Sequence, residues 1–177
     1  MLMRAALLAA ALAGPALGQG GEPVPRAPVV VLDRDVLFAT SRLGQRIAAD
    51  LDAASSALAE ENRRIAETLE AEERALTERR DAMAPEAFDA LARDFDQRVV
   101  RLRAEQDAKA REFEAEADRA QARFFERANP VLIDLAQETG ALVILDRRIV
   151  IASADQVDIT ELARARLDAA LGDGGAD

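Results

Sequence analysis

Apolar residues that recur every eleven positions are the feature of this sequence that most restricts its fold. The repeat runs in two blocks. The first comprises Leu43, Ala54, Ile65 and Leu76 with Ile47, Leu58 and Leu69, and the second comprises Leu91, Leu102, Phe113, Phe124 and Leu135 with Phe88, Val99 and Ala110. Eleven residues over three turns keep a stripe nearly straight along an α-helix. Because the stripe is narrow, it favours packing against a partner helix over burial in a globular core.

A short turn separates the two blocks. Its sequence is "DAMAPEAF", and Pro85 can be the first residue of a second helix, a position that tolerates the missing N–H. We predict an antiparallel coiled-coil hairpin over residues 41–130, with the first helix from about Leu43 to Ala82. The second helix is expected to bend or break at Asn129-Pro130. A solvated single helix or a disordered charged tract is the alternative, which the apolar stripe on both sides of the turn disfavours.

Short apolar segments flank this hairpin. Residues 29–32, "VVVL", are β-branched at successive positions, which is typical of a strand buried on both faces. "ALVIL" and "RIVIAS", within residues 141–153, read as two further strands joined by a tight turn around Asp146-Arg147. Since residues 41–129 are helical, the partner for these strands within the chain is residues 29–32. Both ends of the chain are therefore expected to meet in one small sheet of about three strands.

The remaining signals complete a body formed by residues 29–40 and 131–177. Gly140 is suited to end the second helix, and Asp158 can cap a final helix with Glu161 in a capping box. The predicted fold class is mainly α with a small β body. A sheet this small is marginal as an independent core, so association with other copies is expected to cover it. The residues expected to form that assembled body are Val29, Val31, Val143, Ile144, Leu145, Ile149 and Ile151.

The N-terminus has the pattern of a secretory signal peptide. Residues 1–18 contain Arg4, an apolar run too short to span a bilayer, a Gly14-Pro15 break and small residues before the cleavage site. Residues 19–28 carry three prolines and read as an extended leader. The mature chain is thus expected to work outside the cytoplasm. Without any cysteine, it can form no disulfide.

Charge and composition disfavour several functions. Removal of residues 1–18 takes away Arg4 and leaves 22 basic against 33 acidic residues, a net charge of −11. Nucleic acids and anionic membrane surfaces favour basic partners, so neither is expected to bind this chain. There is no His and no Cys, which removes the commonest metal ligands and proton shuttles. Carboxylates at helical spacing on a polar face lack a pocket. We therefore expect no enzyme activity, catalytic residue, metal or cofactor.

The two body segments resemble a known family. "VVVLDRDVLFATSRLGQRI" before the hairpin and "LVILDRRIVIASADQVDIT" after it are similar to the Skp/OmpH family of periplasmic chaperones. The resemblance implies a homotrimer whose sheets form a β-barrel-like body, with three helical arms around a cavity. It also implies an ATP-independent holdase that binds unfolded outer-membrane proteins and prevents their aggregation before membrane insertion. The alternative is a structural coiled-coil envelope protein or an export-complex adaptor.

Client contacts are predicted at a few positions on the arm. Familiar members of the family are strongly basic, whereas this chain is acidic, so apolar surface and local arginines are expected to bind the client. Arg98 and Arg101 belong to a local basic cluster, and Met83 is a flexible apolar residue at the tip. Phe125 points about 100° away from Phe124, so it is expected at the cavity wall or the junction of arm and body.

Overall fold

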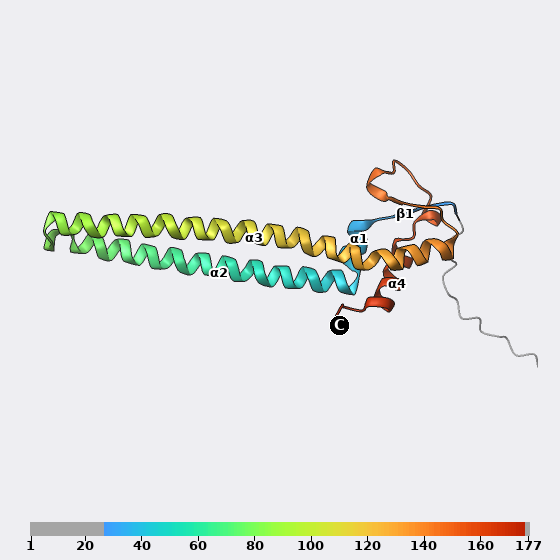
Figure 1. The fold of residues 1–177 in the computed structure, drawn as a ribbon, viewed down its shortest axis with the longest axis horizontal. Helices are drawn as coiled ribbons and strands as arrows, with labels where there is room; N and C mark the ends of the chain where they lie inside the picture. The colour runs from blue at the N-terminus through green and yellow to red at the C-terminus, as the bar shows by residue number, and fades with distance from the viewer. Residues whose placement is uncertain (1–26, 176–177) are drawn as a thin grey trace, which may run out of the picture.

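The structure is a computed structural model that describes residues 27–175. The expected signal peptide (1–18) and most of the expected leader (19–28) therefore lie outside the described residues. In chain order the elements are β1 (Val29–Leu32), α1 (Arg34–Thr40), α2 (Arg42–Arg79), a 3₁₀ turn (Arg80–Ala82), α3 (Pro85–Thr139), β2 (Val143–Asp146), two further 3₁₀ turns (Arg147–Ile149 and Asp155–Val157) and α4 (Thr160–Leu171). The helices α2 and α3 project together as a long arm, and the other elements form a small body at its base (Figure 1). The predicted mainly α fold with a small β body is confirmed.

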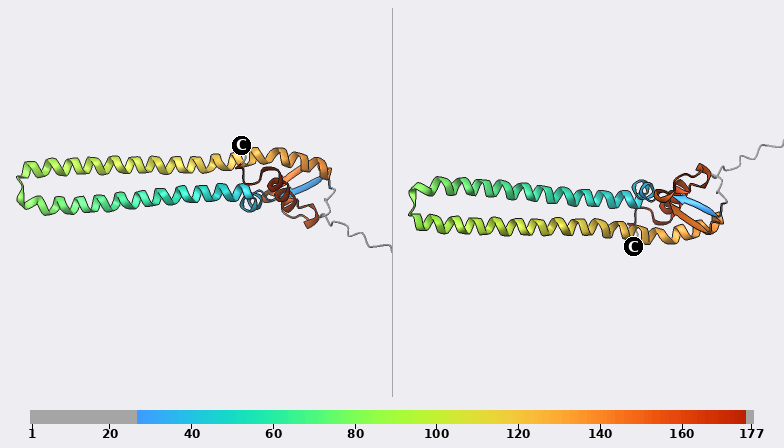
Figure 2. Two further views of the ribbon diagram at one scale, coloured as in Figure 1. Left: turned by 90° about the horizontal axis from the view of Figure 1, so that it is seen from below. Right: turned by 90° about the horizontal axis from the view of Figure 1, so that it is seen from above.

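The two helices of the arm meet along a narrow seam. The half-buried side chains of this seam are Ile47, Leu58, Ile65, Leu69 and Leu76 on α2, and Phe88, Phe95, Val99, Leu102 and Phe113 on α3. Most of them belong to the predicted eleven-residue stripe, although Leu91 is more exposed than expected. Figure 2 shows α2 and α3 side by side along the arm, with α3 continuing past the start of α2 over the body. Because only two helices meet there, the seam side chains keep part of their surface in solvent.

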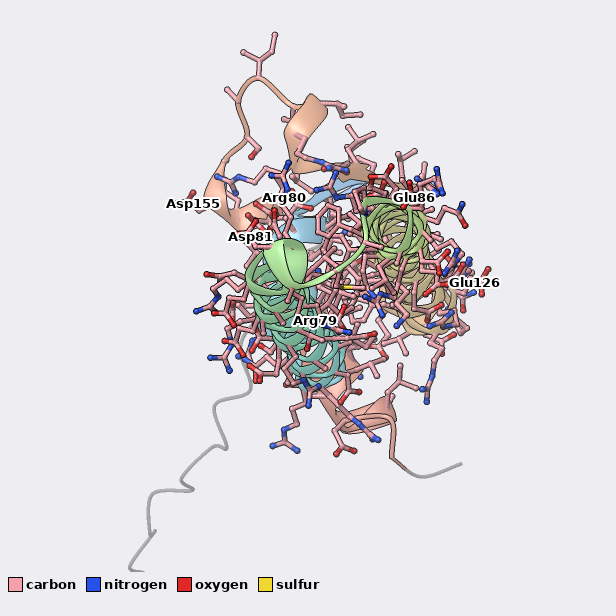
Figure 3. The ribbon with its side chains drawn as sticks, turned by 90° about the vertical axis from the view of Figure 1, so that its left-hand side faces the viewer. Arg79, Arg80, Asp81, Glu86, Glu126 and Asp155 are labelled. Carbon is pink, nitrogen blue, oxygen red and sulfur yellow. The ribbon has the colours of Figure 1, made fainter. Side chains whose placement is uncertain are left out.

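The tip of the arm is a charged turn. The helix α3 begins at Pro85, as predicted, and Met83 precedes it in an extended conformation. Arg79, Arg80 and Asp81 end one side of the turn, and Glu86 begins the other (Figure 3).

A close backbone contact joins α1 to α2 at the base of the arm. The Ser41 hydroxyl oxygen accepts a hydrogen bond from the Gly44 N–H at 3.3 Å and caps α2. A Cβ added at Gly44 would lie 1.8 Å from the carbonyl oxygen of Phe38. Only glycine therefore allows α1 to turn into α2 at this distance.

Gly44→Ala is expected to destabilise the protein. The clash with backbone has no flexible side chain to relieve it, so we expect the free energy of unfolding to fall by about 2 kcal/mol. Helix propensity alone would predict the opposite change, because alanine is more favourable than glycine inside a helix by about 1 kcal/mol. Urea unfolding followed by circular dichroism measures the change, with the reverse substitution at the exposed Ala48 as a propensity control. An increase in stability would contradict the close contact.

Phe124 is at the centre of the body core. Its side chain is fully buried and makes edge contacts with Phe38, at 5.0 Å between ring centroids, and with Phe125, at 4.9 Å. The other large side chains that are fully buried and apolar are Leu37, Leu135, Ile159, Leu167 and Val30. They come from both ends of the chain and from the end of α3. Leu43 and Phe124 lie within the expected arm (41–130), so the base of the arm is part of the core.

The helix α3 continues through Pro130 to Thr139. A bend or a break was expected there. The helix does not break, and Figure 2 shows that this part of α3 curves over the body. A proline inside a helix costs about 3 kcal/mol, because it removes a hydrogen bond and crowds the preceding turn. Burial of Ala128 and Leu135 on either side of Pro130 keeps the helix in place. Gly140, at φ 69°, ends it as predicted.

The sheet has two parallel strands. β1 pairs with β2 in the register Val29↔Val143 to Leu32↔Asp146, so the whole arm is the connection between them. This confirms that the apolar segment after the arm pairs with residues 29–32. On the other edge of β1, the Val31 carbonyl accepts a hydrogen bond from the Ile159 N–H at 2.9 Å.

The predicted hairpin within residues 141–153 is wrong. After β2, residues 147–149 form a 3₁₀ turn, and "RIVIAS" contributes no strand. The Asp146 carboxylate accepts a hydrogen bond from the Arg148 N–H at 3.0 Å, which turns the chain away from β2. A two-residue hairpin loop also favours residues with positive φ, and none of the described non-glycine residues has one.

The start of α4 follows the prediction in part. The Asp158 carboxylate accepts hydrogen bonds from the Thr160 N–H at 2.9 Å and from the Thr160 hydroxyl at 2.6 Å. Glu161 does not complete a capping box, because it pairs with Arg164 at 2.9 Å. The Thr160 hydroxyl in turn accepts from the Asp33 N–H at 2.9 Å, which joins the two ends of the chain.

Candidate functional site

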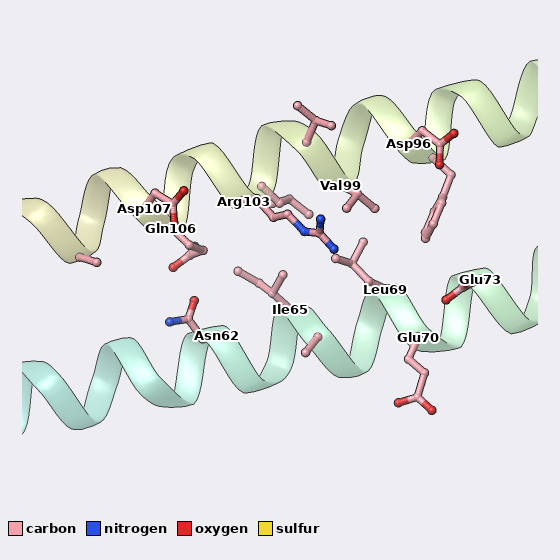
Figure 4. Close-up of a pocket in the computed structure, with 15 residues that line it drawn as sticks. Asn62, Ile65, Leu69, Glu70, Glu73, Asp96, Val99, Arg103, Gln106 and Asp107 are labelled. Atoms are coloured by element: carbon pink, nitrogen blue, oxygen red, sulfur yellow. The ribbon is translucent and has the colours of Figure 1, made fainter.

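The middle of the arm is hollowed along one side of the seam. This hollow, which we call the acidic groove, has a volume of about 930 Å³. Its apolar wall includes Ile65, Leu69, Phe95, Val99 and Val100. Figure 4 shows Ile65 and Leu69 from α2 and Val99 from α3 between the two helices. Val100 is 66% exposed, so apolar surface is open to a ligand here.

The charged side chains around this groove are mostly carboxylates. They are Glu70, Glu73, Asp96 and Asp107, and the basic residue among them is Arg103. The apolar floor and the acidic rim therefore lie side by side in one groove.

The opposite side of the seam, which we call the basic face, has two smaller hollows of about 500 and 540 Å³. Ile65, Leu69 and Leu102 form the apolar part of one of them, so the same seam is open on both sides. The charged residues of the two hollows are Arg64, Arg79, Arg98 and Arg101 with Glu61, Glu72 and Asp94.

Two ion pairs join the helices on the basic face. Glu72 pairs with Arg98, and Glu61 pairs with Lys109. The hydrogen bond from Lys109, with a further one from Gln106, lowers the pKa of the Glu61 carboxyl below its ordinary value. These pairs fix the register, because residue 61 lies opposite 109 and residue 72 lies opposite 98. At i, i+4 spacing, Arg98 and Lys109 could instead pair with Asp94 and Glu105 of their own helix.

Gln106 interrupts the apolar seam with a polar group. Its amide N–H donates to Glu61 at 3.2 Å, whereas its carbonyl oxygen is buried without a partner in the described part of the chain. Unpaired buried acceptors cost free energy, so Gln106 weakens the seam where it lines the acidic groove.

The four residues predicted to contact clients lie in three separate places. Arg98 and Arg101 are both on the basic face, with Arg98 already paired to Glu72. Met83 is half-buried at the tip. Phe125 lies at the junction of arm and body, where the Arg34 guanidinium is 3.9 Å from its ring centroid. Client contact by these residues stays a prediction. Ile65, Leu69 and Val99 of the acidic groove were predicted as seam residues, whereas no binding site was predicted at its carboxylates.

The body exposes much of the apolar surface predicted to mediate assembly. The exposed fraction is 73% for Ile149 and 105% for Ile151, and Val29 and Val143 are also exposed. Leu142, at 85%, belongs to the same exposed set but was not predicted. Ile144 and Leu145 are half-buried. Val31 is buried within the single chain, so its part in assembly stays a prediction. A substitution there would also disturb the core, and exposed residues are better suited to test assembly.

A charged cluster surrounds the loop that follows β2. Arg147 pairs with Asp158, and Arg148 pairs with Asp146 at 2.7 Å. The side-chain hydrogen bond from Arg148, with one from its backbone N–H, lowers the pKa of Asp146. Burial alone raises the pKa of Asp158, but the Thr160 hydrogen bonds and the charge of Arg147 together bring it below its ordinary value.

Asp158→Asn is expected to destabilise the body at neutral pH by about 1–2 kcal/mol, the usual worth of such a cap. The carboxylate has a lowered pKa in the folded chain, so its contribution is fully present above the ordinary pKa of about 3.9 and is lost as pH falls through the folded value. The difference between the two proteins should thus shrink in acid. Thermal unfolding at several pH values measures it, with Asp155→Asn as an exposed control. A difference that does not change with pH would contradict this role.

Other kinds of site find no support in the described residues. Over residues 27–175, His, Cys, Asp and Glu side chains do not gather in groups that could hold a metal ion. Each helix in the same range is too polar or too short to cross a membrane.

A small body with a long helical hairpin is the architecture that these observations define. The sequence model of the family described as Outer membrane protein (OmpH-like) matches residues 28–167. This protein therefore belongs to the OmpH-like family. A comparison with curated proteins finds no match.

The fold is similar to that of a solved structure. It is a crystal structure of a candidate outer membrane chaperone (OmpH-like) from Caulobacter crescentus, with a TM-score of 0.78 and 22% sequence identity. The match covers 88% of this chain and 90% of that one. At this identity the likeness establishes the fold.

Proposed function

We propose that this protein is an ATP-independent holdase chaperone of the periplasm. It binds unfolded outer-membrane proteins in a cavity between helical arms and prevents their aggregation before membrane insertion. The observation that carries the proposal is the arm itself, whose seam leaves apolar grooves open on both sides. Membership of the OmpH-like family and the signal peptide predicted at residues 1–18 support it.

The cavity needs several arms, and the exposed body surface supports a homotrimer. Ile149 and Ile151 are large apolar side chains in solvent beside β2, whose outer edge has no strand partner in the described chain. Contiguous exposed apolar surface of this kind marks interaction sites. A cyclic assembly through the body places the arms side by side around a common space.

Client binding is proposed to consist of many weak contacts. Shallow grooves that are open to solvent bury little of any one segment, but several grooves on several arms raise the overall affinity. Met83, Arg98, Arg101 and Phe125 remain proposed contacts within this arrangement. No nucleotide is needed, since release follows from the weakness of each contact when the client finds a membrane partner.

Suppression of aggregation tests the proposal. An outer-membrane protein diluted from urea scatters light as it aggregates, and the mature chain is expected to suppress that scattering without ATP. A matched concentration of an unrelated acidic coiled coil controls for charge and helicity. If scattering is the same with both proteins, the chain is a structural coiled coil or adaptor rather than a chaperone.

A further inference from the structure

The two sides of the arm seam differ in charge. The residues that line the acidic groove carry four carboxylates, of which that of Glu70 points away from it, and one guanidinium. On the basic face, four guanidinium groups accompany three carboxylates, and ion pairs to α3 engage Glu61 and Glu72. The same apolar seam is therefore bordered by a net acidic surface on one side and a net basic surface on the other.

The carboxylates at one end of the acidic groove are unneutralised. Figure 4 shows Glu73 on α2 and Asp96 on α3 at the same end of the groove. Neither side chain has a hydrogen bond or an ion pair within residues 27–175. By contrast, Glu70 pairs with Arg74 at 3.6 Å and points away from the groove. Each of the Glu73 and Asp96 carboxylates is therefore open to a cationic side chain from a ligand.

Arg103 occupies the middle of the groove. In Figure 4 its guanidinium lies between the helices beside Leu69. Arg103 is also the basic residue of this rim. Its long side chain therefore covers apolar surface while its charge offsets part of the acidic rim.

We propose that the acidic groove binds an extended client segment in which apolar side chains alternate with Lys or Arg. Its apolar side chains contact Leu69, Val99 and Val100, and a basic side chain takes the position between Glu73 and Asp96. In the empty arm, Arg103 covers the floor and moves aside when a segment binds. This proposal rests on the proposed chaperone function, because the segment belongs to an unfolded client.

The dimensions of the groove fit such a segment. The lining residues on α2 run from Asn62 to Glu73, which is about 16 Å along a helix. An extended segment of about five residues has the same length. Successive side chains of an extended segment point to opposite sides, so one set can face the floor while the other reaches the rim.

Peptides that differ only in charge test the proposal. The probes are two fluorescently labelled peptides of about eight residues, with the same apolar residues alternating with Lys in one and with Glu in the other. Their binding to the mature protein is measured by fluorescence anisotropy at several salt concentrations. The Lys peptide is expected to bind at least about threefold more tightly than the Glu peptide, with an affinity that falls as salt rises.

Neighbouring residues on opposite sides of the arm provide matched variants. Asp96→Asn is expected to weaken binding of the Lys peptide by about twofold or more, whereas Asp94→Asn leaves it unchanged, although both remove one carboxylate. Arg103→Gln should strengthen binding, since it uncovers the floor and removes a competing cation. Arg64→Gln, which makes the same change of charge on the basic face, should not strengthen it to the same degree. Val100→Ser should weaken both peptides, because it removes exposed apolar surface.

Three results would overturn the proposal. They are equal affinity for both peptides, equal effects of Asp94→Asn and Asp96→Asn, and loss of the assembled state in Val100→Ser, which would make the groove a contact between copies. Suppression of aggregation is measured on the same samples. If it persists while the peptides show no preference, the groove assignment fails and the chaperone function stands. If the wild-type protein suppresses no aggregation, the proposed function itself fails.

Discussion

Removal of residues 55–115, with the ends joined by a short Gly/Ser loop, is expected to abolish chaperone activity and leave an assembled body. The cross-helix ion pairs give the register in which these residues face each other, so the shortened hairpin keeps its alignment. The buried residues Leu43, Ala120 and Phe124 all remain, and with them the core at the base of the arm. The acidic groove and the basic face are lost together.

Two measurements on this truncated protein separate assembly from activity. Sedimentation velocity is expected to give a trimer, since the exposed apolar residues of the body are untouched. Light scattering with an unfolded outer-membrane protein is expected to rise as if no chaperone were present, which is a complete loss. A second variant that lacks only residues 81–86 at the tip is the control and should keep most of the activity. A truncated protein that still kept clients soluble would show that the body, not the arm, binds them.

The arm could be predicted from the sequence because its signals are local and repeated. The eleven-residue step specifies one face of each helix over many turns, and Pro85 and Gly140 mark positions where backbone preferences are strong. The pairing of residues 29–32 with the segment after the arm followed from exclusion, since the rest of the chain is helical.

The body was predicted less well because its structure depends on contacts between distant segments. "RIVIAS" has the composition of a strand. Hydrogen bonds from Arg148 to Asp146 nevertheless turn the chain, so no strand follows β2 in this segment. Gly44 has no local signal inside a helix, since its role comes from the approach of Phe38. Pro130 is a helix breaker by local preference, and burial on both sides of it outweighs that preference.

The difference in charge between the two sides of the arm could not be seen from the net charge. A total of −11 describes the average surface, but Asp94 and Asp96 lie on opposite sides of the seam although they are two positions apart. The eleven-residue stripe contains the needed information, because positions just before and just after a seam residue face opposite ways. Projection of the charges around each stripe would have separated the acidic groove from the basic face.

Ile149→Asp combined with Ile151→Asp is expected to convert the proposed trimer into monomers. Both side chains are exposed in the single chain, so the substitutions should leave its own stability within about 0.5 kcal/mol. In the assembly, full burial of each isoleucine stabilises the association by about 1.5–3 kcal/mol, and every copy of the chain contributes both side chains. An aspartate at the same position loses this term and places an unpaired charge in an apolar contact, which costs several kcal/mol more.

Sedimentation velocity of the double variant measures this dissociation, and far-ultraviolet circular dichroism shows whether the helices persist. Val100→Asp is the matched control, because Val100 is also a largely exposed apolar residue but lies on the arm, away from the body. It should leave the trimer intact. Because separated arms cannot enclose a cavity, the double variant should also lose most of its suppression of aggregation. An intact trimer in the double variant would mean that the copies associate through another surface, and a monomeric wild-type protein would exclude the cavity.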